Sequence, residues 1–463
     1  MRIKRDLYLN KLIKHKHNGF IKIISGVRRS GKSFLLFELF KEHLLESGIK
    51  NDHIISIALD NRKYIKLQDP DLCYEYIESN IKDNDMYYLF IDEVQLMNNF
   101  ESVLNGCLYI KNLDVYVTGS NSKFLTTDIV TEFRGRGDEI KIHPLSFSEY
   151  YSAVNGSWNK ALDEYLTYGG MPALFSYDTH TEKEEYLKRL FYETYIKDLV
   201  ERNKIKNEIE FSELLDVLAS NIGTLTNPKK LSDTFSSVQN NKTISEPTIK
   251  LYLSYLSNAF LINKVLRYDI KGKKYLNTPF KCYFIDTGLR NARLNFRQFE
   301  PTHLIENVIY NELCIMGYQV DVGNIEIREQ NQDKSYSKKR LEVDFVVNAG
   351  SKQYYIQSAY MMPTLEKQQQ EEKSLLHIDN SFKKIIIVNE DIIPKHQENG
   401  ITILGLKDFL LNKNSLDLAW NKRGLGNSKA FEGASPQAAL KHSEDNAPSN
   451  SEASFRCIVY FTR

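Results

Sequence analysis

The sequence predicts an α/β protein whose first part is a parallel sheet with helices on both faces. Apolar runs of strand length alternate with amphipathic helical segments through about the first 140 residues. Two of these runs end in polar or acidic side chains, as expected where the carboxyl ends of parallel strands line a site. The length of 463 residues suggests roughly three domains, so further modules follow the sheet.

The composition is that of a folded, water-soluble protein, with 42% hydrophobic and 26% charged residues. No stretch approaches the ~20 consecutive apolar residues of a membrane span, and the N-terminus lacks an apolar signal segment, so we expect a cytoplasmic protein. Five widely spaced cysteines predict neither a zinc site nor a disulfide framework. The net charge of +1 requires that any nucleic-acid binding come from a local basic face.

The first predicted strand, residues 21–24, leads into GVRRSGKS, a complete G-x-x-x-x-G-K-[ST] phosphate-binding pattern. Glycines allow the tight turn, and the following helix, residues 35–45, presents its positive end to a phosphate. We predict an ATP site in which Lys32 reaches the β- and γ-phosphates and Ser33 binds Mg²⁺. A chance glycine turn is the alternative, which the order of strand, loop and helix disfavours. The predicted nucleotide-binding residues are Gly26, Val27, Arg28, Arg29, Ser30, Gly31, Lys32 and Ser33.

Residues 52–59 form a further predicted strand, and the next apolar run, YYLFIDE at residues 87–93, ends in two acids. Such a run suits a strand buried on both faces of the sheet. Asp92 would hold Mg²⁺, directly or through water, and Glu93 would polarise the attacking water. Strands that end in two acids are common by chance, but they rarely follow a complete phosphate loop at this spacing.

The next strand, residues 115–117, ends in a cluster of small polar residues. Ser120 or Asn121 would contact the γ-phosphate or orient the water there, although such a cluster is equally typical of an ordinary turn. Arg134 and Arg136 follow in EFRGRGDEI. One of them is a candidate arginine finger, acting in cis or from a neighbouring subunit, and the alternative is a solvated basic turn. Arg28 and Arg29 either hold the loop against acidic neighbours or approach the nucleotide.

Five segments together resemble a large family of bacterial and archaeal ATPases: GVRRSGKS, FIDEVQ, TGSNSKFL, FRGRGDEIKIHPLSFSEY and YGGMPALF. That family pairs an AAA-type P-loop core with a C-terminal domain of unknown function, and the resemblance covers residues 1 to about 410. It implies an AAA-type ATPase core at 1–150. The glycines of YGGMP predict a sharp turn between helices, which is a hinge or cap, and a small helical lid beside the nucleotide, at 151–207, is the functional alternative. The family resemblance also implies ATP hydrolysis with Glu93, Asn121 and Arg136 as catalytic residues and Ser33 and Asp92 as metal ligands.

Residues 208–300 show several helical segments followed by a ribbon, an order that resembles a winged helix-turn-helix. In a DNA-binding version, the recognition helix would carry Thr248, Lys250 and Tyr252. The basic wing would contain Lys271, Lys273 and Lys274. Winged helices also serve as protein-interaction modules, and the near-neutral chain leaves that alternative open.

Residues 301–412 alternate again between helices and strands and resemble the core of restriction-endonuclease-like nucleases. Glu306 and Asp344 match two acidic positions of the Mg²⁺ site in such enzymes. The E-x-K position reads Gln357-Ser358-Ala359, and an amide and an alanine are poor replacements for a metal ligand and a base. We therefore expect a binding platform without nuclease activity. Residues 413–463, rich in Gly, Ser, Ala and Asn, are expected to be a disordered tail.

The leading functional hypothesis is an ATP-binding and ATP-hydrolysing AAA-type protein whose nucleotide state controls a winged-helix and C-terminal binding platform. One alternative is an ATP-regulated nuclease, and another is a slow, nucleotide-gated regulatory switch or scaffold. The expected cofactors are ATP and Mg²⁺. Possible partners are DNA, through the winged-helix module, a protein, or further copies of the chain, and no membrane is expected.

Overall fold

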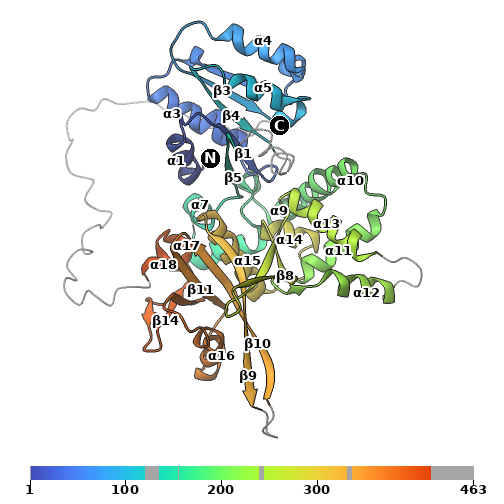
Figure 1. Ribbon diagram of the computed structural model, residues 1–463, viewed down its shortest axis with the longest axis vertical. Helices are drawn as coiled ribbons and strands as arrows, with labels where there is room; N and C mark the ends of the chain where they lie inside the picture. Colours follow the sequence, from blue (N-terminus) through green and yellow to red (C-terminus); the bar gives the residue numbers. More distant parts are fainter. Residues whose placement is uncertain (1, 120–134, 155, 239–243, 331–335, 419–463) are drawn as a thin grey trace, which may run out of the picture.

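The first part of the chain forms a sheet of five parallel strands in the order β2-β3-β4-β1-β5 (Figure 1). The computed structural model describes residues 2–119, 135–154, 156–238, 244–330 and 336–418. Strands β1 and β3 are buried along their whole length, because helices cover both faces of the sheet. The strands are β1 (Ile21–Gly26), β2 (Ile54–Ala58), β3 (Tyr87–Asp92), β4 (Leu113–Thr118) and β5 (Gly137–Ile142).

Two groups of helices cover this sheet. One face packs against α1 and the helical run that follows the phosphate loop, with Leu36, Phe40 and Tyr116 in the shared core. The other face packs against α4 and α5 through Ile77 and Leu104. These helices are α1 (Asp6–Lys14), α2 (Lys32–Phe34), η1 (Leu35–Phe40), α3 (Lys41–Glu46), α4 (Pro70–Asn80) and α5 (Phe100–Cys107). The predicted α/β fold with a parallel sheet is confirmed, although the sequence pattern does not predict the charged edge strand β5.

A mixed sheet of nine strands forms the second part of the molecule, in the order β13-β14-β12-β11-β10-β9-β7-β8-β6. Strands β7 and β8 are the ribbon predicted in the winged-helix module, and β7 runs parallel to β9, with Arg267 opposite Val322. The ribbon therefore belongs to the same sheet as the C-terminal strands. Strands β9 and β10 extend into a hairpin that projects from the body (Figure 1). The strands are β6 (Leu225–Thr226), β7 (Ile262–Asp269), β8 (Lys274–Phe284), β9 (Gln319–Gln330), β10 (Tyr336–Ala349), β11 (Lys352–Ala359), β12 (Lys383–Val388), β13 (Lys395–His396) and β14 (Ile401–Gly405).

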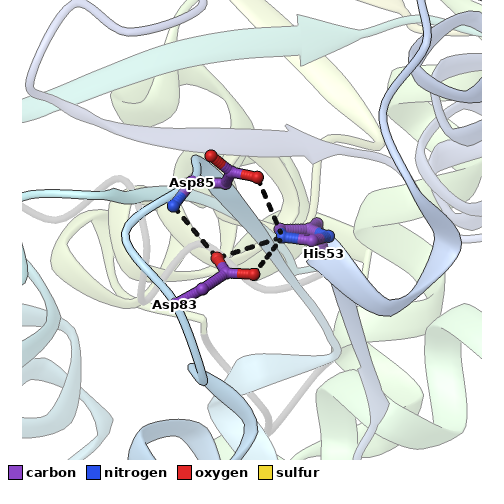
Figure 2. A group of neighbouring side chains, drawn as sticks. All are labelled: His53, Asp83 and Asp85. Atoms are coloured by element: carbon purple, nitrogen blue, oxygen red, sulfur yellow. Dashed lines mark hydrogen bonds and ion pairs between the residues drawn. The ribbon is translucent and has the colours of Figure 1, made fainter.

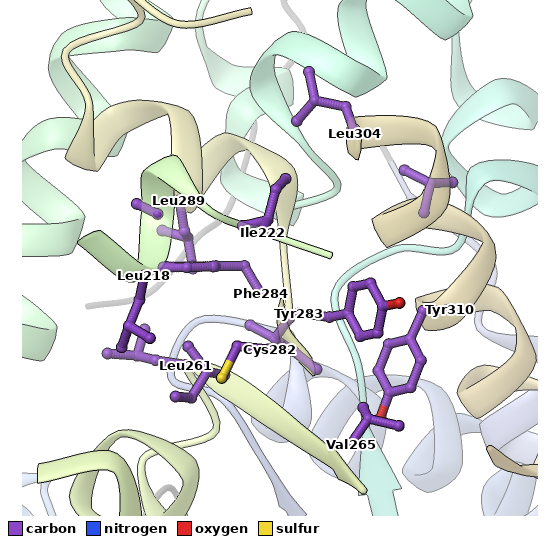
Figure 3. Close-up of a cluster of buried hydrophobic side chains, with 14 of the residues drawn as sticks. Leu218, Ile222, Leu261, Val265, Cys282, Tyr283, Phe284, Leu289, Leu304 and Tyr310 are labelled. Carbon is purple, nitrogen blue, oxygen red and sulfur yellow. The ribbon is translucent and has the colours of Figure 1, made fainter. Parts of the chain in front are cut away.

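One hydrophobic core joins the segments that the sequence assigns to a lid, a winged helix and a C-terminal domain. Figure 3 shows part of it, with Leu218 from α11, Val265 from β7 and Leu304 from α15. These segments therefore pack as one unit. Its helices are α7 (Phe147–Ala153), α8 (Trp158–Tyr168), η6 (Pro172–Ser176), α9 (His180–Arg189), η7 (Leu190–Ile196), α10 (Lys197–Asn203), α11 (Glu208–Ser220), α12 (Pro228–Val238), α13 (Glu246–Asn258), α14 (Thr287–Arg293), α15 (Pro301–Ile315), α16 (Leu365–Leu376), α17 (Leu406–Leu411) and α18 (Ser415–Leu418).

The YGGMP segment forms a tight turn between α8 and η6. Gly169 has a φ of 75°, and a Cβ atom there would lie 2.2 Å from Asp286 Oδ1. The Gly170 N–H donates to Asp286 Oδ2 over 2.7 Å, and the Leu145 N–H donates to the Gly170 carbonyl over 2.8 Å. The segment is therefore a tightly packed junction between α8 and α14. Side chains at these two glycines would clash with Asp286 and with the Leu145 carbonyl.

The predicted start of the disordered tail, at residue 413, is too early, because helix α18 (Ser415–Leu418) lies beyond it. Leu416 is buried, and the Asp417 carboxylate accepts hydrogen bonds from Lys352 and Tyr354 of β11. These contacts hold the chain on the second sheet up to residue 418, and the remainder of the predicted tail lies outside the described residues. Within the described ranges, no helix has both the length and the apolar character needed to cross a membrane.

Candidate nucleotide-binding site

The phosphate-loop segment connects β1 to α2 through two glycines in conformations that other residues rarely adopt. Gly26 has a φ of 137°, and a Cβ atom there would lie 2.1 Å from the carbonyl oxygen of Ile142 on β5. Gly31 has a φ of 94° and is the N-cap of α2. Both glycines let the backbone turn into the helix, whose first N–H groups and positive dipole end favour a phosphate.

Lys32, Ser33 and Asp92 lie together at the carboxyl ends of β1 and β3. The Ser33 hydroxyl donates to Asp92 Oδ1 over 3.0 Å. The Lys32 ammonium donates to the carbonyl oxygens of Gly26 and Val27, both at 3.0 Å. The structure thus brings together the three side chains that the sequence assigns to phosphates and Mg²⁺, and a hydroxyl with a carboxylate fits the preference of Mg²⁺ for oxygen ligands.

Thr118, the last residue of β4, is a member of this site that the sequence pattern does not identify. Its hydroxyl donates to Asp92 Oδ1 and accepts the Glu93 N–H over 3.2 Å. Strand β4 lies between β1 and β3, so a side chain at its carboxyl end reaches the site from the middle of the sheet. The only signal in the sequence was the position of Thr118 at the end of a buried strand.

Burial determines the electrostatics of the site. Burial lowers the pKa of Lys32 to about 8, although the carboxylates of Glu93 and Asp92 act in the opposite direction. Burial also raises the pKa of Asp92, while hydrogen bonds from Thr118 and Ser33 oppose the increase. Lys32 therefore remains charged at neutral pH in surroundings where water screens its attraction to a phosphate only weakly.

Glu93 directly follows Asp92, which is the last residue of β3. Its backbone has a φ of 50°, a left-handed conformation that is uncommon for a residue other than glycine. Its carboxylate accepts a hydrogen bond from the side-chain amide of Gln95. Backbone conformations of this kind cluster at active sites, where they direct a side chain.

Arg136 lies at the opposite end of the sheet from the phosphate loop. Its carbonyl oxygen accepts the Ile21 N–H over 2.9 Å, at the amino end of β1, whereas the loop leaves β1 at Gly26. Five residues of strand separate these points by about 16 Å. Arg136 therefore does not reach the phosphate site of its own subunit. Ser120, Asn121 and Arg134 lie outside the described residues.

The second part of the molecule holds the backbone of the phosphate loop. The Tyr195 hydroxyl, on η7, donates to the Arg28 carbonyl over 2.7 Å. The Arg28 guanidinium lies 3.6 Å from the Asp198 carboxylate on α10, so Arg28 faces an acidic neighbour. Val27 is fully buried and belongs to the hydrophobic core of the second part. The middle of the loop is thus shared between the two parts of the protein.

The other two loop residues differ in their contacts. The Ser30 hydroxyl donates to the Val27 carbonyl over 2.8 Å, and its own carbonyl accepts a hydrogen bond from the buried Arg5 guanidinium over 3.1 Å. Arg29 is exposed and has a φ of 63°. Ser30 therefore stabilises the turn, while Arg29 extends toward solvent.

The helix predicted to recognise DNA is α13, and one of its three assigned contacts is wrong. Tyr252 is buried and packs against Phe211, with ring centroids 5.1 Å apart, so it is not available to a base edge. Lys250 is exposed but pairs with Glu246 over 2.7 Å. The sequence pattern groups Tyr252 with Thr248 and Lys250. In the structure, Tyr252 belongs to the face of α13 that is buried in the core.

The acidic residues predicted in the C-terminal segment come together around a lysine. Lys281 Nζ, on β8, lies 2.8 Å from Glu306 Oε1 and 3.3 Å from Asp344 Oδ1. Asp344 lies on β10, and Gln357 lies on the neighbouring strand β11. The Gln357 Oε1 accepts a hydrogen bond from the Asp344 N–H over 3.4 Å. The sequence thus predicts the meeting of Glu306, Asp344 and Gln357, but it does not predict the lysine between the two acids.

A separate cluster lies at the amino ends of β2 and β3, where His53 faces two aspartates (Figure 2). His53 Nε2 is 3.2 Å from both carboxylate oxygens of Asp83 and 3.9 Å from Asp85 Oδ2, and its Nδ1 is 3.0 Å from Asp52 Oδ1. One imidazole and two carboxylates are groups that bind divalent metal ions. The cluster lies across the sheet from Asp92, so it is not part of the nucleotide site.

We expect this cluster to make stability depend on pH. Burial lowers the pKa of His53, but hydrogen bonds and charges from Asp52 and Asp83 outweigh burial and raise it. A raised folded pKa stabilises the protein fully below the unfolded pKa of about 6.5, and this contribution is lost as pH rises through the folded value. His53→Gln should therefore reduce the free energy of unfolding more at pH 6 than at pH 8.5, as measured by urea denaturation. An equal reduction at both pH values would contradict this assignment.

Comparison with known protein families agrees with this geometry. A family model described as an AAA domain matches residues 18–151, and a model described as a domain of unknown function matches residues 159–300. An uncharacterized protein of Haemophilus influenzae is 33% identical over 415 residues, which cover 88% of this chain and 98% of that protein. An uncharacterized protein of Methanocaldococcus jannaschii is 29% identical over 411 residues, which cover 84% of this chain and 86% of that protein.

Solved structures show more distant similarity. The Aeropyrum pernix ORC2 protein has 12% identity and a TM-score of 0.30, and the match covers 56% of this chain and 84% of that one. The A. pernix ORC1 protein, in complex with DNA, has 10% identity and a TM-score of 0.29, with coverage of 63% and 92%. The five-stranded sheet, the AAA-domain match and the H. influenzae relative together show the family of this chain. The chain belongs to a family of AAA-type P-loop proteins in which an AAA domain precedes a domain of unknown function.

Proposed function

We propose that the chain binds and hydrolyses ATP at the phosphate loop, and that the nucleotide state changes the packing of the second part against this loop. Lys32 would contact the β- and γ-phosphates, and Ser33 and Asp92 would hold Mg²⁺. Glu93 would accept a proton from the attacking water. When bound, Mg²⁺ would neutralise charge on the phosphate oxygens. Membership of an AAA-type family supports nucleotide binding here.

The observation that carries the coupling is the hydrogen bond from Tyr195 to the Arg28 carbonyl, at 2.7 Å. This bond joins the backbone that would surround the phosphates to η7, which packs in the core of the second part. If the loop closes on a phosphate, the Arg28 carbonyl would move. The hydrogen bond to Tyr195 would transmit this movement to η7. This hydrogen bond supports a path from the nucleotide to the helices and the second sheet.

Tyr195→Phe tests this path, because it removes only the hydroxyl. We expect the variant to bind ATP but to lose most of the ATP-dependent change in amide hydrogen exchange over α10–α13 that the unchanged protein shows. Hydrogen exchange would be measured with and without a non-hydrolysable ATP analogue, alongside a direct binding titration.

Tyr186→Phe provides a matched control from the preceding helix, α9. The Tyr186 hydroxyl is buried and has no hydrogen-bond partner among the described residues, so its removal should leave the exchange response intact. An ATP-dependent response in Tyr195→Phe equal to that of the unchanged protein would contradict the proposed path.

We further propose that Arg136 acts on the phosphate site of a neighbouring subunit. Measured along β1, it lies about 16 Å from its own loop, at the opposite end of the sheet. It is also exposed, so it is available to a second copy of the chain. A role as arginine finger therefore requires a homo-oligomer in which the amino end of β5 faces the phosphate loop of the next subunit.

DNA contact through the ribbon turn is a second candidate activity, supported by the exposure of Lys271, Lys273 and Lys274. We expect DNA to stimulate ATP turnover at low salt and to lose this effect as salt increases. Replacing the three lysines with alanine should reduce the slope of log affinity against log salt by about 0.9 for each DNA phosphate that the variant no longer neutralises. An unchanged slope, equal to that of a Lys395→Ala/Lys413→Ala control, would exclude the ribbon turn as the DNA-binding surface.

A further inference from the structure

The acidic centre of the second sheet is built around the ammonium group of Lys281. Lys281 Nζ lies 2.7 Å from Glu342 Oε1, 2.8 Å from Glu306 Oε1 and 3.3 Å from Asp344 Oδ1. An ammonium group has three N–H donors and no acceptor. Its three donors therefore match the three carboxylates. Glu306 lies on α15, and Glu342 and Asp344 lie on the same face of β10.

The carboxylates have further partners that fix them around the lysine. The Tyr283 hydroxyl donates to Glu306 Oε1 over 2.6 Å. The Ser358 N–H donates to Asp344 Oδ2 over 2.9 Å. One oxygen of each of these two acids thus already accepts a hydrogen bond from another part of the chain.

A divalent cation does not fit this donor set as it stands. Two of the acids, Glu306 and Asp344, are those that the sequence pattern matches to a Mg²⁺ site. The point between them is occupied by Lys281, whose side chain is only 3% exposed. A metal ion there would face a buried positive charge at close range, in surroundings where like charges repel strongly.

We infer that Lys281 is the resident cation of this centre and takes the place of a divalent metal ion. The acidic cluster is then a metal-free ion network that fastens the β7–β8 ribbon to α15 and β10. It does not support metal-dependent cleavage of a phosphodiester. The neutral Gln357 agrees with this assignment, because a fourth carboxylate would leave still more negative charge uncompensated by a single ammonium group.

Lack of access does not explain the exclusion of a metal ion. A cavity of about 390 Å³ opens beside the centre, and Glu342 and Gln357 are among its lining residues. The Glu342 side chain is 36% exposed. Solvent ions therefore reach the outer carboxylate, and the ammonium group behind it is what keeps them from the inner two.

Manganese titration of the full chain, followed by electron paramagnetic resonance without nucleotide, tests this inference. The number of Mn²⁺ ions bound by each protein is compared with the number bound by its Asp344→Asn variant. An ion bound near the phosphate loop is then present in both proteins and does not affect the difference. We expect the unchanged protein and Asp344→Asn to bind the same number of Mn²⁺ ions. We expect Lys281→Met to bind one more, and Lys281→Met/Asp344→Asn to lose that extra ion.

Any of three outcomes would overturn the inference. The first is an Mn²⁺ ion bound by the unchanged protein and absent from Asp344→Asn. The second is Mg²⁺-dependent plasmid nicking that Asp344→Asn abolishes. The third is a folded Lys281→Met variant with no additional ion. If Lys281→Met does not fold because the three acids lack their cation, the comparison of the unchanged protein with Asp344→Asn still decides the question.

Discussion

Glu93→Gln is expected to reduce ATP turnover by about 10²–10⁴-fold while ATP affinity stays essentially unchanged. The amide has the shape of the carboxylate but cannot accept a proton from water. The substitution does not alter the residues proposed to bind the phosphates and Mg²⁺, which are Lys32 and the hydrogen-bonded pair of Ser33 and Asp92 at 3.0 Å. Turnover would be followed as phosphate release, and affinity by titration with a fluorescent ATP analogue.

Glu75→Gln on α4 is a suitable control, because it makes the same change from acid to amide at an exposed residue of the first part. It should leave both quantities unchanged. The same experiment separates the proposed ATPase from a slow nucleotide-gated switch. A protein that binds ATP but shows no turnover even with Glu93 intact would support the switch and contradict the assignment of Glu93 as a base.

Arg136→Ala is expected to lower turnover by about 10³-fold or more if Arg136 is an arginine finger. Lys32→Ala should be inactive for a different reason, because it lacks the ammonium group on the phosphates. When the two variants are mixed, an Arg136→Ala subunit has an intact phosphate site and a Lys32→Ala subunit supplies Arg136. We therefore expect the mixture to recover measurable activity that neither variant has alone.

This recovery depends on the distance of Arg136 from its own loop, about 16 Å along β1. A finger that acted within one subunit would give no recovery on mixing. Arg297→Ala, which removes an exposed arginine of the second part, should keep full turnover. A mixture that stays inactive under conditions where the chain is oligomeric would rule out Arg136 as a finger between subunits.

The phosphate loop could be predicted because its chemistry is local. Two glycines, a lysine and a serine at fixed spacing determine a turn and the start of a helix. Asp92 could also be predicted beside Ser33, because the carboxyl ends of parallel strands meet at one edge of the sheet. Thr118 could not, since its role depends on β4 lying between β1 and β3, and strand order is not encoded in any one segment.

Long-range packing also decided where single residues point. The spacing of α13 allowed Tyr252 to lie on either face, and contact with Phe211 placed it in the core. Arg136 is close in sequence to the predicted sensor loop, but hydrogen bonding between β5 and β1 placed it at the far end of the sheet. The predicted winged helix and C-terminal domain became one unit because β7 pairs with β9, and the predicted lid joins them through the shared hydrophobic core.

By itself, the sequence determined that a phosphate loop precedes a helix, that an acidic strand follows, and that the first part is an α/β sheet. Each of these depends on neighbours a few residues apart. Only the tertiary structure decided that Tyr195 holds the loop through Arg28 and that Lys281 lies among three acids. Those contacts join residues far apart along the chain, and their positions are set by strand pairing and the burial of a shared core.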